Sequence, residues 1–119
     1  MEKIVEQALL YDFYGELLTE HQKSIYEDFV LNDLSLGEIA QDRDISRQGV
    51  YDIVKRCNRQ LEGYEEKLHL VEKFIGTKEK VEKIHACAGE ILTHADDAVR
   101  MIECIKKIEV ISNAIIEDL

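Results

Sequence analysis

The segment SLGEIAQDRDISRQGVYDIVKR, residues 35–56, predicts two short helices joined by a tight turn, and it constrains the fold more than any other part of the chain. Ser35 is followed three residues later by Glu38, which is the capping-box pattern that starts a helix. Ser46 offers a second N-cap before another helical stretch. The segment therefore predicts a helix over 36–43, a turn, and a longer helix that begins after Ser46.

The rest of the chain is predicted to be helical too, so the expected fold class is all-α. The 119 residues include no proline to break a helix, and no long stretch alternates apolar and polar residues as a strand would. Apolar residues at helical spacing predict a first helix that ends near Leu18. Thr19 and Gln22 form another capping box, which predicts a second helix over about 20–31.

The spacing of the two central helices is that of a helix-turn-helix, whose second helix lies in the major groove of DNA. Ala40 suits the point where these helices cross, because a larger side chain would push them apart. The turn position that is usually Gly is Asp44, and Asp is one of the few other residue types that adopt the left-handed conformation. The residues expected to point inward are Ile39, Ala40, Ile45, Val50 and Ile53.

The second of these helices, predicted to begin at Arg47, carries the candidate nucleic-acid-binding residues. Arg and Gln side chains make bidentate contacts with guanine and adenine edges, whereas Lys and Arg further along a helix contact phosphates. The candidate site consists of Ser46, Arg47, Gln48, Tyr51, Lys55, Arg56 and Arg59.

The chain as a whole is acidic, which disfavours binding to a polyanion such as nucleic acid. One segment is basic, however. The formal net charge is −10, of which residues 1–33 carry −6, 34–67 carry −1 and 68–119 carry −3. Residues 46–61 hold four basic side chains and one acid, a local charge of +3. At physiological salt, charges separated by more than about 8 Å are largely screened from one another. The same basic residues could also form a plain solvated helix face.

The C-terminal part predicts a long helical stripe. We expect the helix from Arg47 to continue to Ile75 and to end at Gly76, which divides the chain into a helix-turn-helix domain over 1–75 and a helical arm over 76–119. The arm carries a seam with alternating steps of three and four residues, which is typical of a coiled coil. The seam consists of Val81, Ile84, Ala88, Ile91, Ala95, Ala98, Ile102 and Ile105, and Ile108, Ile111, Ile115 and Leu119 continue it in a shifted phase.

Two interpretations of this seam remain open. Gly89 or the THADD stretch at 93–97 could break the arm into a helical hairpin that folds within the chain. Alternatively, the seam could hold two copies together as a homodimer through residues 81–115, which would place two recognition helices on successive major grooves.

No catalytic, cofactor-binding or metal-binding site is expected, and we predict that the chain is not an enzyme. The three Cys include no CxxC pair, and the four His are scattered singly along the chain. Free thiols of this kind fit a reduced, cytoplasmic setting. The N-terminal stretch is interrupted by charges, so it predicts neither a signal peptide nor a membrane-inserted helix.

Four stretches occur in the order LLYDFYGELLTEHQ, LNDLSLGEIA, SRQGVYD and YEEKLHL. Together they resemble the YlxM family of small bacterial helix-turn-helix proteins, over about residues 8–75. The portion from Thr19 to Leu61 is in turn similar to region 4 of the bacterial sigma factors, which reads the −35 promoter element. This resemblance implies nucleic-acid contacts at Arg47, Gln48, Tyr51, Lys55 and Arg56, in agreement with the candidate site above.

The resemblance also implies a biological setting. Genes of the YlxM family lie beside the gene for the signal recognition particle GTPase, which suggests a role in protein targeting. The chain would then be a regulator, or an accessory factor that touches the RNA or the GTPase of the particle. The alternative is a non-catalytic adaptor that binds the GTPase or another basic protein through the acidic residues 1–33.

Overall fold

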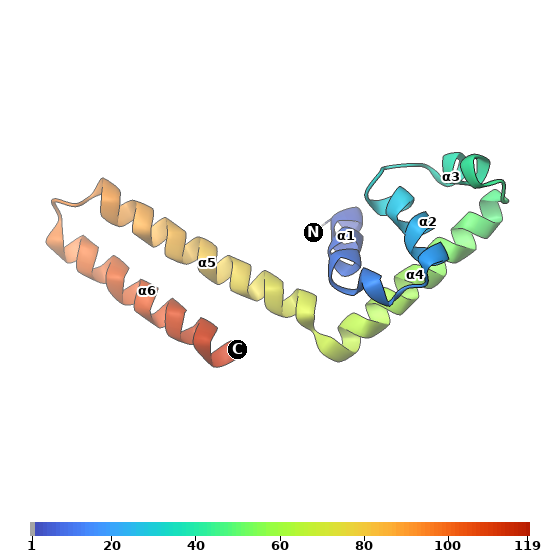
Figure 1. Ribbon diagram of the computed structural model, residues 1–119. Coiled ribbons are helices and arrows are strands. Elements are labelled where there is room, and N and C mark those ends of the chain that lie inside the picture. The colour runs from blue at the N-terminus through green and yellow to red at the C-terminus, as the bar shows by residue number, and fades with distance from the viewer. Residues whose placement is uncertain (1) are drawn as a thin grey trace. The chain divides into compact units, whose positions relative to one another are not determined.

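A computed structural model describes residues 2–119, and over those residues all of the regular secondary structure is helical, which confirms the all-α fold class (Figure 1). The chain forms two compact units, one ending at Val71 and the other beginning at Glu72, and each is described by itself. The elements in chain order are α1 (Lys3–Tyr14), a 3-10 turn (Gly15–Leu17), α2 (Glu20–Val30), α3 (Leu36–Arg43), α4 (Arg47–Leu68), α5 (Leu70–Thr93) and α6 (Ala98–Asp118).

The capping boxes start α2 and α3 where the sequence predicts. The Thr19 hydroxyl accepts from the backbone N–H of Gln22 at 3.2 Å, and the Gln22 side chain accepts from the Thr19 N–H at 3.1 Å. Ser35 and Glu38 make the same reciprocal pair at 3.1 and 3.2 Å. The first helix is shorter than expected, because the 3-10 turn replaces its last residues before Leu18.

The turn between α3 and α4 has the predicted conformation. Asp44 adopts φ 54° and ψ 44°, in the left-handed region. This conformation lets the backbone N–H groups of Asp44 and Ile45 both donate to the carbonyl oxygen of Ala40, which closes the end of α3. The chain then leaves the turn at Ser46 with the geometry of an N-cap, so α4 begins at once. The helix-turn-helix is thus built by local hydrogen bonds.

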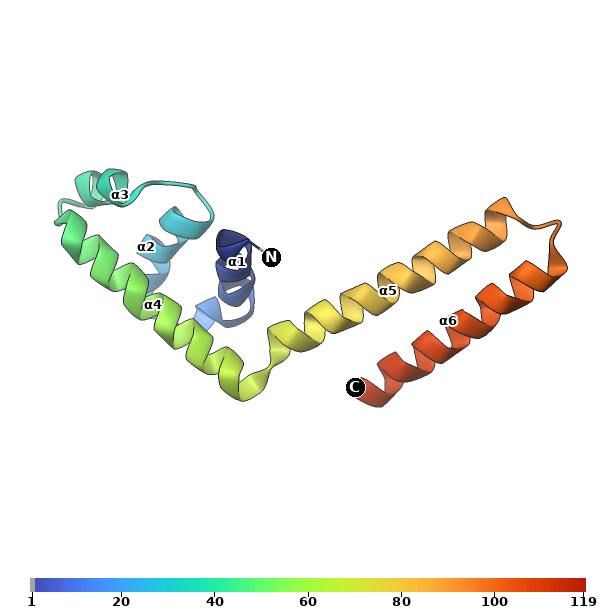
Figure 2. The same cartoon turned by 180° about the vertical axis from the view of Figure 1, so that it is seen from behind.

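The core of the first unit lies between α4 and the three helices that precede it (Figures 1 and 2). Of the five residues expected to point inward, Ile39, Ala40 and Val50 are buried, and Ile45 and Ile53 are half-buried. The largest fully buried side chains are Tyr14, Tyr26, Ile25, Ile39, Leu61, Val50 and Cys57.

An ion pair ties α3 to α2 at the edge of this core. Arg43 donates through Nη2 to Asp28 Oδ2 at 2.7 Å and to the backbone carbonyl of Ser24 at 3.3 Å. The Arg43 guanidinium holds the pKa of the Asp28 carboxyl below its usual value, mainly through this hydrogen bond. The pair fixes the end of the first helix of the helix-turn-helix.

The expectation of one helix from Arg47 to Ile75 that ends at Gly76 is wrong. His69 adopts φ 56°, which ends α4, and α5 begins at the next residue and continues through Gly76. A distant tyrosine, Tyr14, and a nearby glutamate, Glu65, stabilise this break. Tyr14 accepts from the Leu70 N–H at 3.2 Å and donates to Glu65 at 2.6 Å, and Glu65 also accepts from the Val71 N–H at 2.9 Å.

The second unit is a hairpin in which α5 and α6 run antiparallel, side by side in both views (Figures 1 and 2). Lys80 pairs with Asp118 at 2.5 Å and Arg100 pairs with Glu90 at 2.8 Å, which sets the register of the two helices. Among the described residues of this unit, Cys104 is the one buried side chain. The predicted seam is therefore divided by the turn, and its members are half-buried or exposed.

None of the helices that the structure describes combines the length and the apolar composition that crossing a membrane requires.

Candidate nucleic-acid interface

The first half of α4 has a buried apolar face and an exposed polar face on its opposite side. Val50, Val54 and Cys57 follow one another at helical spacing and are buried against the rest of the unit. Residues between them must therefore point outward. All six candidate residues on the helix itself are exposed: Arg47, Gln48, Tyr51, Lys55, Arg56 and Arg59.

Ser46, the seventh candidate, has a structural role in the helix start. Its hydroxyl oxygen accepts from the backbone N–H of Gly49 at 3.0 Å. The hydroxyl group is exposed, and its own proton is not used in that bond. Ser46 thus sets the direction of α4 and leaves one donor at the helix N-terminus, where an anion is favoured.

Three of the candidate residues share one hollow. Arg47, Gln48 and Tyr51 line it together with Leu36 of α3, and its volume is about 340 Å³. The Gln48 side chain also donates to Asp52 Oδ1 at 3.0 Å, which holds the amide along the helix and engages the one acid of residues 46–61. The structure therefore brings together the residues that the sequence predicts to read base edges.

Tyr51 also contacts the residues predicted for phosphate binding. The Lys55 ammonium lies 5.8 Å from the centre of the Tyr51 ring, within range of a cation–π interaction. Tyr51 is 45% exposed, so this contact leaves much of the ring accessible. Lys55 consequently lies beside Tyr51, which lines the hollow with Arg47 and Gln48.

Tyr51 also lines a second groove. Its volume is about 590 Å³, and it contains Lys55 and Arg59 of the predicted site. Part of the remaining lining comes from α1 and α2, which the sequence does not connect with this site, so sequence reasoning missed the groove. The remaining lining residues are Lys3, Ile4, Gln7, Phe29, Leu36, Val54, Asn58 and Glu62.

The basic side chains of this face are free of intramolecular ion pairs. No described residue forms a salt bridge with Arg47, Lys55, Arg56 or Arg59. Several acids of the preceding helices are engaged, by contrast: Glu16 pairs with Lys23, Asp28 pairs with Arg43, and Glu27 accepts from the Tyr11 hydroxyl. The arrangement leaves the local positive charge available to a ligand.

The amino-acid sequence of this chain is similar to those of known proteins. The profile of the family UPF0122, described as "Putative helix-turn-helix protein, YlxM / p13 like", matches residues 1–108. A UPF0122 protein of Caldanaerobacter subterraneus subsp. tengcongensis is 59% identical over 80 residues, which are 67% of this chain and 68% of the relative. A UPF0122 protein of Bacillus cereus strain AH187 is 41% identical over 109 residues, which are 92% of this chain and 99% of the relative. The family match thus extends into α6, beyond the residues 8–75 that carry the resemblance in sequence motifs.

Proposed function

The chain belongs to the YlxM / p13-like helix-turn-helix family, and from this membership and the geometry of α4 we propose that it is a non-catalytic regulator that binds nucleic acid. The observation that supports the proposal best is the exposed basic face of α4, whose cations form no ion pair with any described residue. In this proposal the first half of α4 enters a groove of the nucleic acid. Arg47 and Gln48 read base edges there, and Lys55, Arg56 and Arg59 contact phosphates.

The experiment that tests the proposal compares two substitutions in a binding titration by gel shift or fluorescence anisotropy. We expect Arg47→Ala to reduce discrimination between sequences by about 1–3 kcal/mol, because it removes a bidentate base contact. We expect Lys55→Ala to weaken binding to all sequences alike and to reduce the slope of log affinity against log salt concentration by about one unit.

A matched control is available on the same helix. Lys67 is exposed near the end of α4, outside residues 46–61, so Lys67→Ala should leave binding unchanged. Absence of binding to both DNA and RNA at low salt would contradict the proposal. Equal losses of affinity in Lys67→Ala and Lys55→Ala would show that binding depends only on the overall charge of the protein.

We place this function in the signal recognition particle pathway, as a regulator or as an accessory factor. The support is the resemblance to the YlxM family and the gene neighbourhood that this resemblance implies. The titration should therefore include a promoter duplex and the RNA of the targeting particle. Preference for the particle RNA would support a direct role in targeting, and preference for the duplex would support transcriptional regulation.

An adaptor function is the second candidate, because exposed acids gather in the N-terminal part of the chain. Glu2, Glu6 and Asp12 are exposed around α1, and Glu20 is exposed at the start of α2. Such a surface would attract a basic partner, for example the targeting GTPase. A pull-down with the purified GTPase, with and without nuclease, separates the two functions. Capture that survives nuclease treatment would favour the adaptor.

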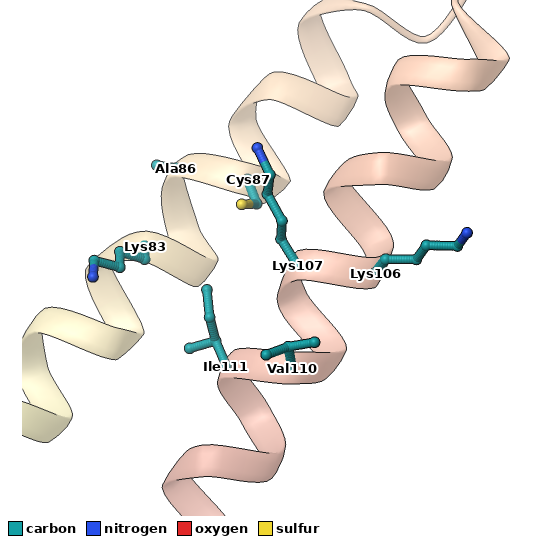
Figure 3. Close-up of a pocket in the computed structure, with 7 residues that line it drawn as sticks. All are labelled: Lys83, Ala86, Cys87, Lys106, Lys107, Val110 and Ile111. Atoms are coloured by element: carbon teal, nitrogen blue, oxygen red, sulfur yellow. The ribbon is translucent and has the colours of Figure 1, made fainter.

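We also propose that two copies associate through the α5–α6 hairpin, residues 81–115. Figure 3 shows Cys87 and Ile111 in the space between the two helices, where they line a hollow of about 490 Å³. Ile102 and Ile105 are each 52% exposed, so the hairpin alone leaves much apolar surface in water. A second hairpin packed on it would form a four-helix arrangement that covers this surface.

Light scattering tests the association. We expect a mass of twice 13.8 kDa at micromolar concentration, and we expect Ile105→Glu to halve it without loss of helicity. Asn113→Glu, at an exposed position of the same helix, adds the same single negative charge and serves as the control. A wild-type mass near 13.8 kDa would exclude the dimer.

A further inference from the structure

The groove beside Tyr51 includes one buried polar side chain, that of Gln7. Gln7 of α1 is only 7% exposed, yet its amide forms no hydrogen bond with any residue that the structure describes. Buried amides in folded proteins are nearly always hydrogen-bonded, because an unpaired one loses its interactions with water. The Gln7 amide therefore has hydrogen-bonding groups that no described residue uses.

The amide of Gln7 must be reached from the groove. No fully buried side-chain nitrogen or oxygen among the described residues lacks a hydrogen-bond partner, so the polar end of Gln7 keeps some access to solvent. Gln7 lines the groove, which provides that access. A molecule that fills the groove could thus exchange donor and acceptor bonds with this amide.

The lining of the groove includes aromatic and aliphatic side chains. Tyr51 of α4 and Phe29 of α2 contribute aromatic rings, and Ile4 and Val54 contribute aliphatic surface. A volume of about 590 Å³ lies in the range of small-ligand sites, which is about 300–1,000 Å³. A planar group with hydrogen bonds at its edge would match both the walls and the amide.

The charged side chains of the groove favour an anion. Lys3, Lys55 and Arg59 are exposed lining residues, and Glu62 is the one acid among the lining residues that the structure describes. A nucleotide combines the required features, since its base has a flat face and a polar edge and its phosphate is negative. Base stacking on aromatic side chains, with Arg or Lys along the backbone, is how proteins bind unpaired nucleotides.

We propose that this groove receives one unpaired base of the nucleic acid that α4 binds. The Gln7 amide pairs with the edge of the base, Tyr51 and Phe29 contact its face, and Lys3 and Arg59 approach the flanking phosphates. The inference rests on the proposed nucleic-acid binding and makes it more specific, because it selects a bulge or a loop over a continuous duplex. Tyr51 and Lys55 lie on the border of both surfaces and would couple them.

The test measures binding of the full-length protein to matched RNA hairpins by fluorescence anisotropy. One hairpin carries a single unpaired 2-aminopurine, and a second has an abasic nucleotide at that position, so both have the same number of phosphates. We expect the wild-type protein to bind the first about tenfold more tightly, with quenching of 2-aminopurine fluorescence by stacking. DNA versions of both hairpins show which nucleic acid supplies the base.

Two variants connect the preference to the groove. Gln7→Met keeps the length of the side chain and removes its hydrogen-bonding groups, so it should abolish most of the preference and leave binding to the abasic hairpin unchanged. Gln41→Met is the matched control, because Gln41 is an exposed amide on α3 outside the groove. Circular dichroism verifies that both variants are folded.

The outcomes separate this inference from the proposed function. Equal affinity of the wild-type protein for the two hairpins would overturn the base site and leave nucleic-acid binding intact. An equal loss of affinity for both hairpins in Gln7→Met would show that the groove contacts paired nucleotides. This result would also overturn the base site. Failure of the wild-type protein to bind any hairpin would overturn the proposed function itself.

Discussion

The two units of the chain contain apolar residues at similar helical spacing but bury them to very different extents. In the first unit, Ile25, Tyr26, Val50 and Leu61 have essentially no exposed surface. In the second, Cys104 is the one buried side chain among the described residues. The difference is geometric, because four helices that cross can enclose a core, whereas two helices side by side leave at least one face of each in solvent.

The comparison shows that a hydrophobic stripe identifies the face of a helix that can be buried. It does not identify the element that covers this face. The seam of α5 and α6 is as regular as the buried face of α4, and regularity alone does not show what covers it. The polar contacts of the two units differ in the same way. Arg43 and Asp28 pair at the edge of a core, whereas the ammonium of Lys80 and the carboxylate of Asp118 pair at an exposed position.

The largest expected effect comes from the same substitution made in each unit. Leu61→Ala should lower the free energy of unfolding by about 2–5 kcal/mol, because it leaves a cavity in the filled core. Leu92→Ala should change it by less than about 0.5 kcal/mol, because Leu92 is 83% exposed. Urea denaturation followed by tyrosine fluorescence measures the first unit alone, since all five Tyr precede residue 71.

Far-ultraviolet circular dichroism in the same titration reports both units. A large loss of helicity in Leu92→Ala would indicate that this side chain is covered in solution, and would contradict the exposed hairpin.

Local chemistry explains why the helix-turn-helix could be predicted from the sequence. Ser35, Glu38 and Ser46 act on neighbouring backbone groups, and Asp44 needs only its own conformational tolerance. The bounds of α3 were therefore predicted to the residue. The exposed face of α4 followed from helical spacing in the same way.

The break at His69 could not be predicted, because one of its determinants, Tyr14, is distant in sequence. Tyr14 and Glu65 bind the backbone of the next helix, and no local pattern announces that contact. His does enter the left-handed region more often than most residues, which is a weak local signal. The groove around Gln7 was missed for the same reason, since it is assembled from four helices.

A smaller effect is expected from the ion pairs. Asp28→Asn should destabilise the first unit by about 1–3 kcal/mol at neutral pH, because it removes a charged acceptor from the partly buried Arg43. Asp118→Asn, in the exposed pair with Lys80, should change the unfolding of the hairpin too little to measure. Urea midpoints at pH 7 test both variants.

The pH dependence gives this prediction a second readout. The pKa of Asp28 in the folded protein lies below its unfolded value near 3.8, so its stabilisation is fully present above that value. It is lost as the pH falls through the lower, folded pKa. The difference in the free energy of unfolding between the wild-type protein and Asp28→Asn should therefore decrease below about pH 4. A constant difference down to pH 2 would exclude the ion pair as its cause.

The helix caps are expected to contribute less than the Arg43–Asp28 ion pair, and they bear most directly on whether the two units unfold independently. The Ser35 hydroxyl accepts from the Glu38 N–H at 3.1 Å, and the Asp97 carboxylate accepts from the Arg100 N–H at 3.1 Å. Because capping is local, Ser35→Ala and Asp97→Ala should each cost about 1 kcal/mol in their own unit. Ser35→Ala should shift the tyrosine transition, whereas Asp97→Ala should shift the helicity signal alone. A tyrosine transition that moves equally in both variants would show that the hairpin and the core unfold together.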